Sequence, residues 1–442
     1  MTRVLYWNIE NFAFNKIANP QTGKRQRGGG LVQADAAQNR RWYVRQVLNA
    51  AAADIIVVVE VETAYDGRGR LTRGAGGDGC IELLREIRAA YNNQWMLVPP
   101  IQTGPRESVA VFYRSTRRYF AGPYVWPGGA AGVAAAPGAA TGAYPALFNN
   151  RLPNRLVPAG ALQNAATNER RCAARVAFTY RANHPTNANA AIDWGFSRAP
   201  YMVSFAETDG AVPPNVLRNL TLFAIHAPAA YVFADTHLRL LADVAQIYAA
   251  PGGNEVRLVI GDFNINLLRG DLTEAGAYGP LQATAGYTLA LRPANPLPPN
   301  LQGYQGYFAT HIRRQFSAGC WSTQGNPVYY PGYDYIGSDI VAGLYAIDNA
   351  FTRYGGGGGA ANFTILNAIA RSPLQVGGAY GAGPPGTVPM PRLVDQPPPA
   401  SPAYPPAQGP QHTPGLRAAF QGWAEYGYIR STSDHLPLVI DI

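Results

Sequence analysis

The stretch LVIGDFNIN, residues 258–266, passes from a short apolar run into an acid, an aromatic residue and an amide. Its first three residues have the length and branching of a buried strand, and a glycine ends that strand. The end of such a strand directs side chains into the crevice above a sheet, where polar groups usually contact a ligand or a metal. Asp262 and Asn264 are therefore the first candidates for a functional site.

The composition is that of a globular protein with a large core, because 47% of the 442 residues are hydrophobic. No run approaches the ~20 apolar residues of a membrane helix. The N-terminus enters an apolar run directly, without the pattern of a signal peptide. We expect no membrane association, a monomer, and a location in the cytoplasm or outside the cell by a route without a cleavable signal.

The charge balance favours a polyanionic partner such as nucleic acid. The formal net charge is +9, and arginine supplies all but two of the 36 basic residues. Planar guanidinium groups suit phosphate, although biased codon usage would produce the same excess of arginine. Cys80, Cys172 and Cys320 are widely spaced, so we expect free thiols and neither a disulfide framework nor a thiolate metal site.

Strand and helix patterns alternate along the chain. Apolar runs predict strands at residues 2–9, 54–62, 95–100, 108–114, 201–206, 220–227, 256–264, 333–340 and 436–442. Helical periodicity lies between them at residues 44–51, 81–87 and 238–248, the last behind a cap at Asp235 or Thr236. This alternation predicts an α/β fold.

Three stretches rich in Gly, Pro and Ala interrupt this pattern, at residues 121–165, 270–330 and 353–416. Such a composition does not easily pack a core of its own, so we expect long surface insertions. The predicted organisation is a single domain, residues 1–442, that carries three insertions.

Polar side chains recur at the ends of the predicted strands. Asn8 ends the first strand, Glu60 the second and His226 a later one, while Asp434 and His435 precede the last. With the residues of the opening stretch they offer carboxylates, amides and imidazoles to one crevice. The oxygen donors suit a hard divalent cation such as Mg²⁺, and the imidazoles suit proton transfer at a phosphate.

Taken in order, the motifs WNIENF, VVVEVE, IHAP, GDFN, YDYI and SDH resemble those of the endonuclease/exonuclease/phosphatase superfamily. Within it, RESVAVFYR (106–114) and SRAPYMVSF (197–205) are similar to strands of deoxyribonuclease I-like nucleases. The resemblance implies a four-layered sandwich of two packed mixed β-sheets flanked by helices, with the site at the top of the sandwich.

The resemblance also implies a metal site. Glu60 would be the main ligand of Mg²⁺, or of Mn²⁺ in its place. Asn8, Asp262, Asn264 and Asp434 would bind or orient metal, water and phosphate. Asp262 or one of the imidazoles would activate the attacking water.

Two imidazoles oriented by carboxylates would flank the scissile phosphate. The resemblance pairs His226 with Glu107 and His435 with Asp334, and it assigns a phosphate oxygen to Arg198. Which histidine is the acid and which the base stays open. Metal and arginine would stabilise the charge that builds on the pentacoordinate phosphorus.

Some assignments have competitors within the sequence. Glu62 would replace Glu60 if the register shifted by two residues, and Asp339 competes with Asp334. His311 precedes a basic pair without a motif match and is a weaker candidate for a substrate contact. His237, at the expected start of a helix, is predicted to be solvated.

The residues that contact DNA in deoxyribonuclease I-like nucleases are not matched. VETAY follows Glu60, where those enzymes have an arginine that enters the minor groove, and Pro105 stands in place of their minor-groove tyrosine. Catalysis therefore carries over from the resemblance more directly than the mode of DNA binding does.

The leading hypothesis is a Mg²⁺-dependent hydrolase of phosphoester bonds, an endonuclease that cuts DNA with little sequence specificity. RNA stays open as a substrate, because none of these residues reads or excludes a 2′-hydroxyl. The alternative is a phosphatase or phosphodiesterase that acts on inositol phosphates or sphingomyelin-type lipids. A non-catalytic binding module is disfavoured by the complete set of motifs.

Overall fold

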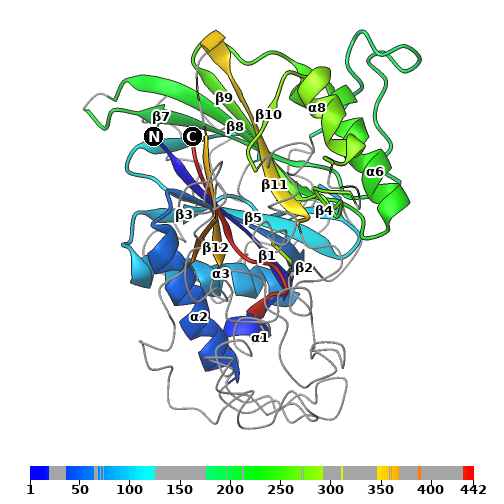
Figure 1. The fold of residues 1–442 in the computed structure, drawn as a ribbon. Coiled ribbons are helices and arrows are strands. Elements are labelled where there is room, and N and C mark those ends of the chain that lie inside the picture. The colour runs from blue at the N-terminus through cyan, green and yellow to red at the C-terminus, as the bar shows by residue number, and fades with distance from the viewer. Residues whose placement is uncertain are drawn as a thin grey trace, which may run out of the picture.

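A computed structural model of the chain describes residues 1–18, 36–63, 68–69, 71–72, 74–124, 176–195, 197–211, 214–269, 271, 273–291, 310–311, 346–357, 359, 361–367, 387–389 and 432–442. Two β-sheets form its centre (Figure 1). The first has eight described strands, of which β4 (Ile101–Gly104) pairs with β5 beside the main path. That path runs β13 (Thr387–Pro389), β12 (Asn362–Asn367), β14 (Leu438–Asp441), β1 (Arg3–Phe12), β2 (Ile55–Glu62), β5 (Glu107–Arg114) and β3 (Trp95–Leu97).

The second sheet has six described strands. Their order is β10 (Thr288–Leu289), β11 (Asp348–Tyr354), β9 (Glu255–Asp262), β8 (Val216–His226), β7 (Tyr201–Thr208) and β6 (Arg118–Gly122). Both sheets are mixed, because β1 and β2 run parallel in the first, β8 and β9 run parallel in the second, and most other neighbours are antiparallel. The two sheets pack on each other through β1, β2, β8 and β9.

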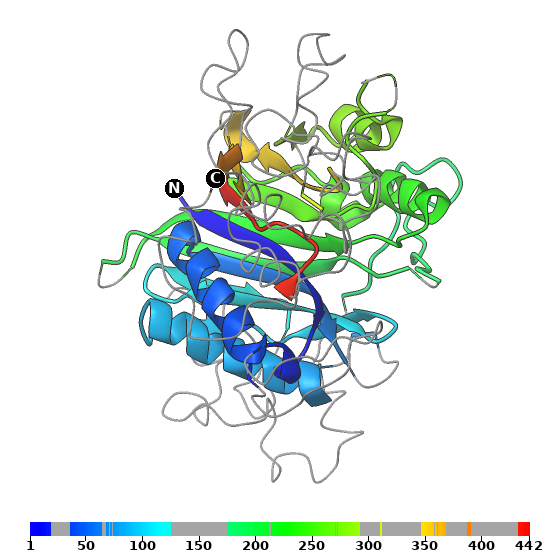
Figure 2. The ribbon, with the colours of Figure 1, turned by 60° about the horizontal axis from the view of Figure 1, so that its bottom comes forward.

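Helices cover the outer faces of both sheets (Figure 2). Against the first sheet lie α1 (Phe14–Ile17), α2 (Ala36–Ala51) and α3 (Gly74–Ala90), with α3 on β2 and β3. On the second sheet's side lie α6 (Tyr231–Leu240), η2 (Leu241–Asp243), α7 (Ala245–Tyr248), η3 (Gly276–Tyr278) and α8 (Gly279–Ala283). The expected four-layered sandwich of two mixed sheets flanked by helices is confirmed.

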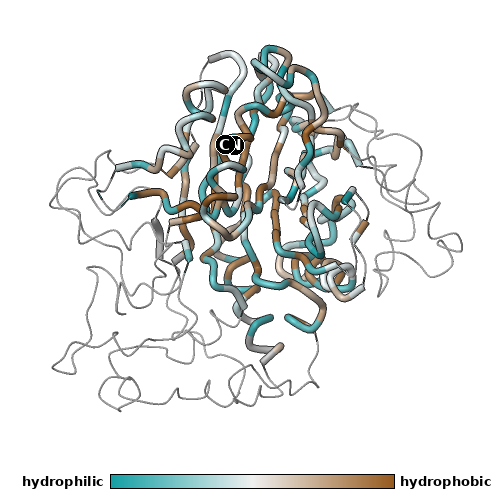
Figure 3. Tube along the Cα trace, turned by 90° about the vertical axis from the view of Figure 1, so that its right-hand side faces the viewer, coloured by the Kyte–Doolittle hydropathy of each residue, from teal (hydrophilic) through white to brown (hydrophobic). Residues whose placement is uncertain are grey.

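The hydrophobic pattern explains these layers. Strands β1 and β2 are almost wholly buried, because one face meets the second sheet and the other meets the helices. Figure 3 shows hydrophobic segments gathered in the interior of the described chain. Helix α3 approaches β2 so closely that a Cβ on Gly76 would lie 1.6 Å from the carbonyl oxygen of Glu62. Only glycine fits there, which accounts for the glycine-rich start of that helix.

The two termini lie side by side (Figure 1). Arg3 of β1 stands opposite Asp441 of β14 in antiparallel register, and their side chains form an ion pair at 2.7 Å. Motifs near both ends of the chain therefore belong to one sheet. Among the described residues, no helix combines the length and the apolar character needed to cross a membrane.

Some sequence expectations fall outside the described residues, and the start of one helix differs from its prediction. The predicted strand at 333–340 lies outside the described residues, as do Cys172 and Cys320, whereas Cys80 is buried and free. Helix α6 begins at Tyr231, before the expected caps, because Thr236 already donates to the carbonyl of Val232 inside the helix.

The expected insertions also contain regular structure. Most of their residues lie outside the described part of the chain. Yet η3, α8 and β10 fall within 270–330, while β12 and β13 fall within 353–416 and extend the first sheet beyond β14. Long-range strand pairing adds these strands to the sheets despite the Gly, Pro and Ala-rich composition of the stretches around them. The single-domain organisation stays a prediction.

Candidate active site

The topology brings the polar strand ends to one edge of the sandwich. The parallel pairs β1–β2 and β8–β9 end at this edge, which collects Asn8, Glu60, His226 and Asp262. The antiparallel neighbours β5, β11 and β14 begin there, since Glu107 is in register with Glu62, Asp348 with Asp262 and Leu438 with Tyr6. Strand order and direction therefore build the site from segments that are far apart in the sequence.

Asn8 lies at the centre of the site and is completely buried. Its Nδ2 lies 3.1 Å from Oε1 of Glu60, 3.2 Å from Oδ2 of Asp262 and 3.3 Å from Nε2 of His435. The amide thus links both sheets. Its Oδ1 is buried and has no hydrogen-bond partner among the described residues, although a buried acceptor without a partner is costly. This atom points to a ligand that the protein alone does not supply.

A β-bulge directs Glu60 into the site. The pairing of β2 with β5 shifts between Val58 and Val61, and Glu60 adopts a left-handed backbone conformation with φ of 57°. Its carboxylate accepts from Asn11 N at 3.1 Å and lies 3.3 Å from Nε2 of His226. The competitor Glu62 is exposed. The structure therefore brings Glu60, and not Glu62, to the cluster.

His226 and Glu107 form the first imidazole–carboxylate pair. Nδ1 of His226 lies 2.8 Å from Oε2 of Glu107, and the same carboxylate forms an ion pair with Arg198. Burial works against the Glu107 carboxylate, but its bonds to His226 and Arg198 outweigh burial and lower its pKa to about 2. Burial likewise disfavours charge on His226, yet the bond to Glu107 raises the pKa of His226 above its usual value while Arg198 opposes that rise.

Arg198 is held inside this pair. Besides Glu107, it donates to the carbonyl of Ala227 at 3.2 Å. Gly104 packs against its stem, where a Cβ would lie 2.5 Å from Cγ of Arg198. The guanidinium is therefore fixed beside His226. Its expected contact with a phosphate oxygen stays a prediction.

His435 and Asp348 form the second pair. Nδ1 of His435 lies 2.7 Å from Oδ2 of Asp348, whose side chain is 0% exposed. The resemblance placed Asp334 at this position, but Asp334 and its competitor Asp339 lie outside the described residues. The carboxylate on His435 is that of Asp348, because the register of β11 with β9 places Asp348 opposite Asp262. Its sequence signal is an acid at the first position of a strand, in IDNAF (347–351).

Negative charge surrounds His435. Its Nε2 lies 3.7 Å from Oδ2 of Asp262 and 3.8 Å from Oδ1 of Asp434. Burial would lower the pKa of His435, but Asp348 and Asp262 outweigh it and raise that pKa to about 10. Burial also raises the pKa of Asp262 to about 6.

A tight turn anchors Asp262 at the end of β9. Its Oδ1 accepts from the backbone N of Asn264 at 2.8 Å, and Asn264 adopts a φ of 52°, which asparagine tolerates well. Asn264 also donates through Nδ2 to the carbonyl of Ala227 at 2.9 Å. The asparagine therefore holds the loop that follows β8 against the loop that follows β9.

Of the other histidines, His237 contradicts its prediction, whereas a substrate contact of His311 stays a prediction. His237 is buried in α6 and not solvated, with its ring 5.4 Å from that of Trp194. Burial lowers its pKa to about 3. His311 lies beside the site, because it pairs with His435 in an isolated antiparallel bridge.

The donor set fits a divalent cation. Glu60, His226 and Asp262 each offer a ligand atom, and these atoms lie within 4.8 Å of one another. Asn8 bridges Glu60 and Asp262 through its Nδ2, and its Oδ1 has no hydrogen-bond partner within the described part of the chain. Oxygen donors of this kind suit Mg²⁺. Glu60, Asp262 and Asn8 are the residues that would hold it.

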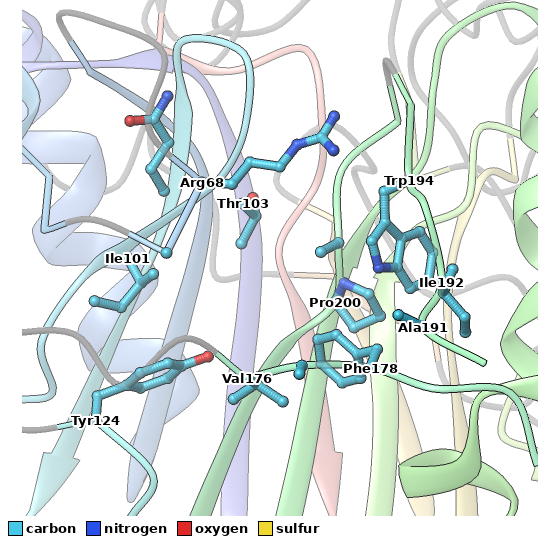
Figure 4. A pocket seen from close by; sticks show the side chains of 14 residues that line it. Arg68, Ile101, Thr103, Tyr124, Val176, Phe178, Ala191, Ile192, Trp194 and Pro200 are labelled. Carbon is cyan, nitrogen blue, oxygen red and sulfur yellow. The ribbon is translucent and has the colours of Figure 1, made fainter. Parts of the chain in front are cut away.

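A cavity of about 310 Å³ is lined by residues that neighbour site residues in the sequence. Figure 4 shows Trp194 and Phe178 on one side, Ile101 and Tyr124 on the other, and Arg68 above them. The cavity also has Ala199 and Pro200 in its wall, the two residues after Arg198. Its mainly apolar and aromatic lining suits an apolar or flat group.

Comparison with known proteins gives a family and distant structural similarities. The model of the Endonuclease/Exonuclease/phosphatase family matches residues 5–336. No curated protein sequence matches the chain.

Three solved structures illustrate the structural similarity. D. rerio TDP2 humanized by 14 mutations has a TM-score of 0.38 at 9% identity, over 100% of this chain and 99% of that one. An endonuclease/exonuclease/phosphatase family protein from Leptotrichia buccalis has 0.39 at 9%, over 100% and 99%. A mannosyl-6-phosphatase from Bacteroides thetaiotaomicron has 0.38 at 11%, over 100% and 99%. Similarities this distant say nothing about the substrate.

Proposed function

The chain belongs to the endonuclease/exonuclease/phosphatase family, whose members are metal-dependent phosphoester hydrolases, and from this premise we propose that it is a Mg²⁺-dependent endonuclease that hydrolyses DNA with little sequence specificity. One observation carries the proposal. Nε2 of His226 and Nε2 of His435 lie 3.6 Å and 3.7 Å from the same atom, Oδ2 of Asp262. Two imidazoles that converge on one point can serve opposite sides of a single phosphate.

The carboxylates behind the imidazoles support proton transfer. Glu107 and Asp348 each bind Nδ1 of their histidine, which turns Nε2 toward the reacting groups and stabilises the imidazolium form. One imidazole, or Asp262, would take a proton from the attacking water, while the other imidazole would give a proton to the leaving oxygen. Arg198, fixed beside His226, would contribute positive charge. When bound, Mg²⁺ supplies further charge stabilisation to the pentacoordinate phosphorus.

The choice of DNA rests on charge. The net charge of +9 favours a polyanion over a small phosphoester, since phosphate neutralisation supplies most of the affinity for nucleic acids. The site residues named here would act on the phosphate, which every nucleotide presents, and this supports low sequence specificity. A phosphatase or phosphodiesterase for inositol phosphates or sphingomyelin-type lipids is the competing class.

The direct test is cleavage of supercoiled plasmid DNA by the purified full chain with Mg²⁺ or Mn²⁺, and with EDTA as the metal-free control. Glu60→Gln should abolish cleavage because it removes a charged oxygen donor at the site. Glu62→Gln is the matched control, since it makes the same change two residues along the strand on an exposed side chain. Plasmid that stays intact with both metals across pH 5 to 9 would overturn the proposal. A phosphate-release screen on soluble and lipid phosphoesters would then identify the competing class.

A further inference from the structure

His311 lies beside His435 although the two residues are far apart in the sequence. They form an antiparallel bridge, and the backbone N of Leu436 donates to the carbonyl of Thr310 at 2.7 Å. Oγ1 of Thr310 accepts from the backbone N of Ile347 and of Asp348. The segment that carries His311 is therefore fixed to the same two strands that position His435 and Asp348.

The bridge places three donor groups together. Nε2 of His311 lies 3.5 Å from Oδ2 of Asp434, and Nε2 of His435 lies 3.8 Å from Oδ1 of Asp434. One ligand atom from each of the three residues lies within 4.8 Å of the others. In a tetrahedral site with metal–ligand bonds of about 2.0–2.1 Å, neighbouring donors lie about 3.4 Å apart. The observed separations need only small side-chain adjustments to reach that geometry.

The surroundings favour a cation at this point. Asp348 accepts from Nδ1 of His435, and a carboxylate behind the far ring nitrogen is the usual support of a metal-binding histidine. The side chains of His311 and Asp434 are 24% and 19% exposed, so an ion can enter from solvent. Two imidazoles and one carboxylate select a transition metal over Mg²⁺, whereas the site around Glu60 is richer in oxygen.

We propose that His311, Asp434 and His435 form a second cation site, which binds Zn²⁺ and thereby inhibits hydrolysis. The inhibition follows from the shared ligand: a Zn²⁺ ion on Nε2 of His435 occupies the nitrogen that would otherwise carry the proton to be transferred. The inhibitory part rests on the proposed function, while the binding part does not.

Binding is tested first, on the metal-free full chain with Mg²⁺ in excess to occupy the oxygen-rich site. Isothermal titration should show one tight Zn²⁺ equivalent, and Co²⁺ in its place should give the visible absorption of a tetrahedral N/O site. His311→Ala should weaken Zn²⁺ binding at least tenfold. His184→Ala is the matched control, because His184 also faces a carboxylate, with Nε2 at 3.7 Å from Oδ2 of Asp243, but lies away from the site. Circular dichroism verifies the fold of both variants.

Inhibition is tested second, with Zn²⁺ titrated into DNA cleavage and each variant compared with its own rate in Mg²⁺ alone. The half-inhibitory Zn²⁺ concentration should rise at least tenfold in His311→Ala and stay unchanged in His184→Ala. Equal Zn²⁺ affinity in wild type and His311→Ala would overturn the site. A protein that cleaves no phosphoester, yet loses Zn²⁺ affinity through His311→Ala, would support the site and overturn the proposed function instead.

Discussion

The two imidazole–carboxylate pairs share one construction and differ in their surroundings. Each pair takes one residue from each sheet: His226 ends β8 and Glu107 begins β5, while His435 precedes β14 and Asp348 begins β11. The Nδ1–carboxylate distances are 2.8 Å and 2.7 Å, and both Nε2 atoms face Asp262. The same hydrogen bond is thus made twice, on opposite sides of the site.

Their neighbours give the pairs different electrostatics. Arg198 binds Glu107 and opposes a proton on His226. On the other side, Asp262 and Asp434 add to the negative charge of Asp348, and the pKa of His435 rises to about 10. Local charges, and not the hydrogen bond, therefore separate the two histidines. The opposing charge of Arg198 suits His226 to act as the base, and the carboxylates around His435 suit it to act as the acid.

The largest effect should come from the imidazoles themselves. His226→Asn and His435→Asn keep an amide that can donate to the carboxylate, so the fold should survive while proton transfer is lost. Each change should lower kcat on DNA by roughly a hundredfold or more, equivalent to about 2.7 kcal/mol of transition-state stabilisation. Steady-state kinetics beside circular dichroism makes the measurement, with His184→Asn as the control. A folded variant with near-normal turnover would refute the role of that histidine.

The next largest effect should come from Glu107 and Asp348, the carboxylates that orient the two histidines and do not themselves react. Glu107→Gln and Asp348→Asn keep an oxygen acceptor but remove the charge that stabilises the imidazolium, so kcat should fall about 10- to 100-fold with little change in KM. We expect the larger loss for Asp348→Asn, since Asp348 makes a large contribution to the raised pKa of its partner His435. A change confined to KM in either variant would show that the residue contributes to binding and not to orientation of the histidine.

The sequence predicts much of the site because its signals are local. Asn8 and Glu60 lie near the ends of apolar strands, His226 and Asp262 are the last residues of theirs, and a polar residue at such a place is visible without any partner. The role of Asp348 cannot be predicted in this way. Its strand begins with Asp-Asn-Ala, which are weak strand formers, and its position depends on the pairing of β11 with β9. The Tyr-Asp-x-Ile pattern therefore favoured Asp334 instead.

The fold shows the same division between local and long-range information. The apolar strands of both sheets and helices α2 and α3 follow from periodicity. Strands β10, β12 and β13 lie in Gly, Pro and Ala-rich stretches, and pairing with distant strands holds them. In β12, Phe363 and Ile365 are buried although composition alone indicated a surface insertion. Composition reports what a segment could bury by itself and not what a neighbouring strand offers it.

Arg198 should affect the pH dependence of the rate through His226 and not through His435. It opposes the proton on His226, so Arg198→Met should raise the pKa of that histidine. If His226 acts as the base, the ascending limb of kcat/KM against pH should then move to higher pH, with about a tenfold loss near neutral pH. Arg181→Met is the control. Arg181 forms an ion pair with Asp243, with an N–O distance of 2.7 Å, and this pair does not belong to the site. An ascending limb that stays in place would assign the base to Asp262 or to His435.

The smallest effect, on stability, should have opposite pH dependence in the two pairs of the metal-free protein. The pKa of Glu107 falls from 4.5 to about 2 on folding, so its contribution is complete above pH 4.5 and is lost as pH falls toward 2. The pKa of His435 rises from 6.5 to about 10, so its contribution is complete below pH 6.5 and is lost as pH rises toward 10.

Thermal unfolding in EDTA from pH 3 to 10 tests both limbs of this difference. Glu107→Gln should flatten the acid limb of Tm and leave the alkaline limb unchanged, whereas His435→Asn should do the reverse. The changes should amount to several degrees, since one pKa unit is worth about 1.4 kcal/mol and about 1 kcal/mol shifts Tm by roughly 2–4 °C in large domains. If Glu107→Gln kept the acid limb of the wild type, the carboxylate would not be charged and paired as the structure has it, and the distinction between the two pairs would have to rest on His435 alone.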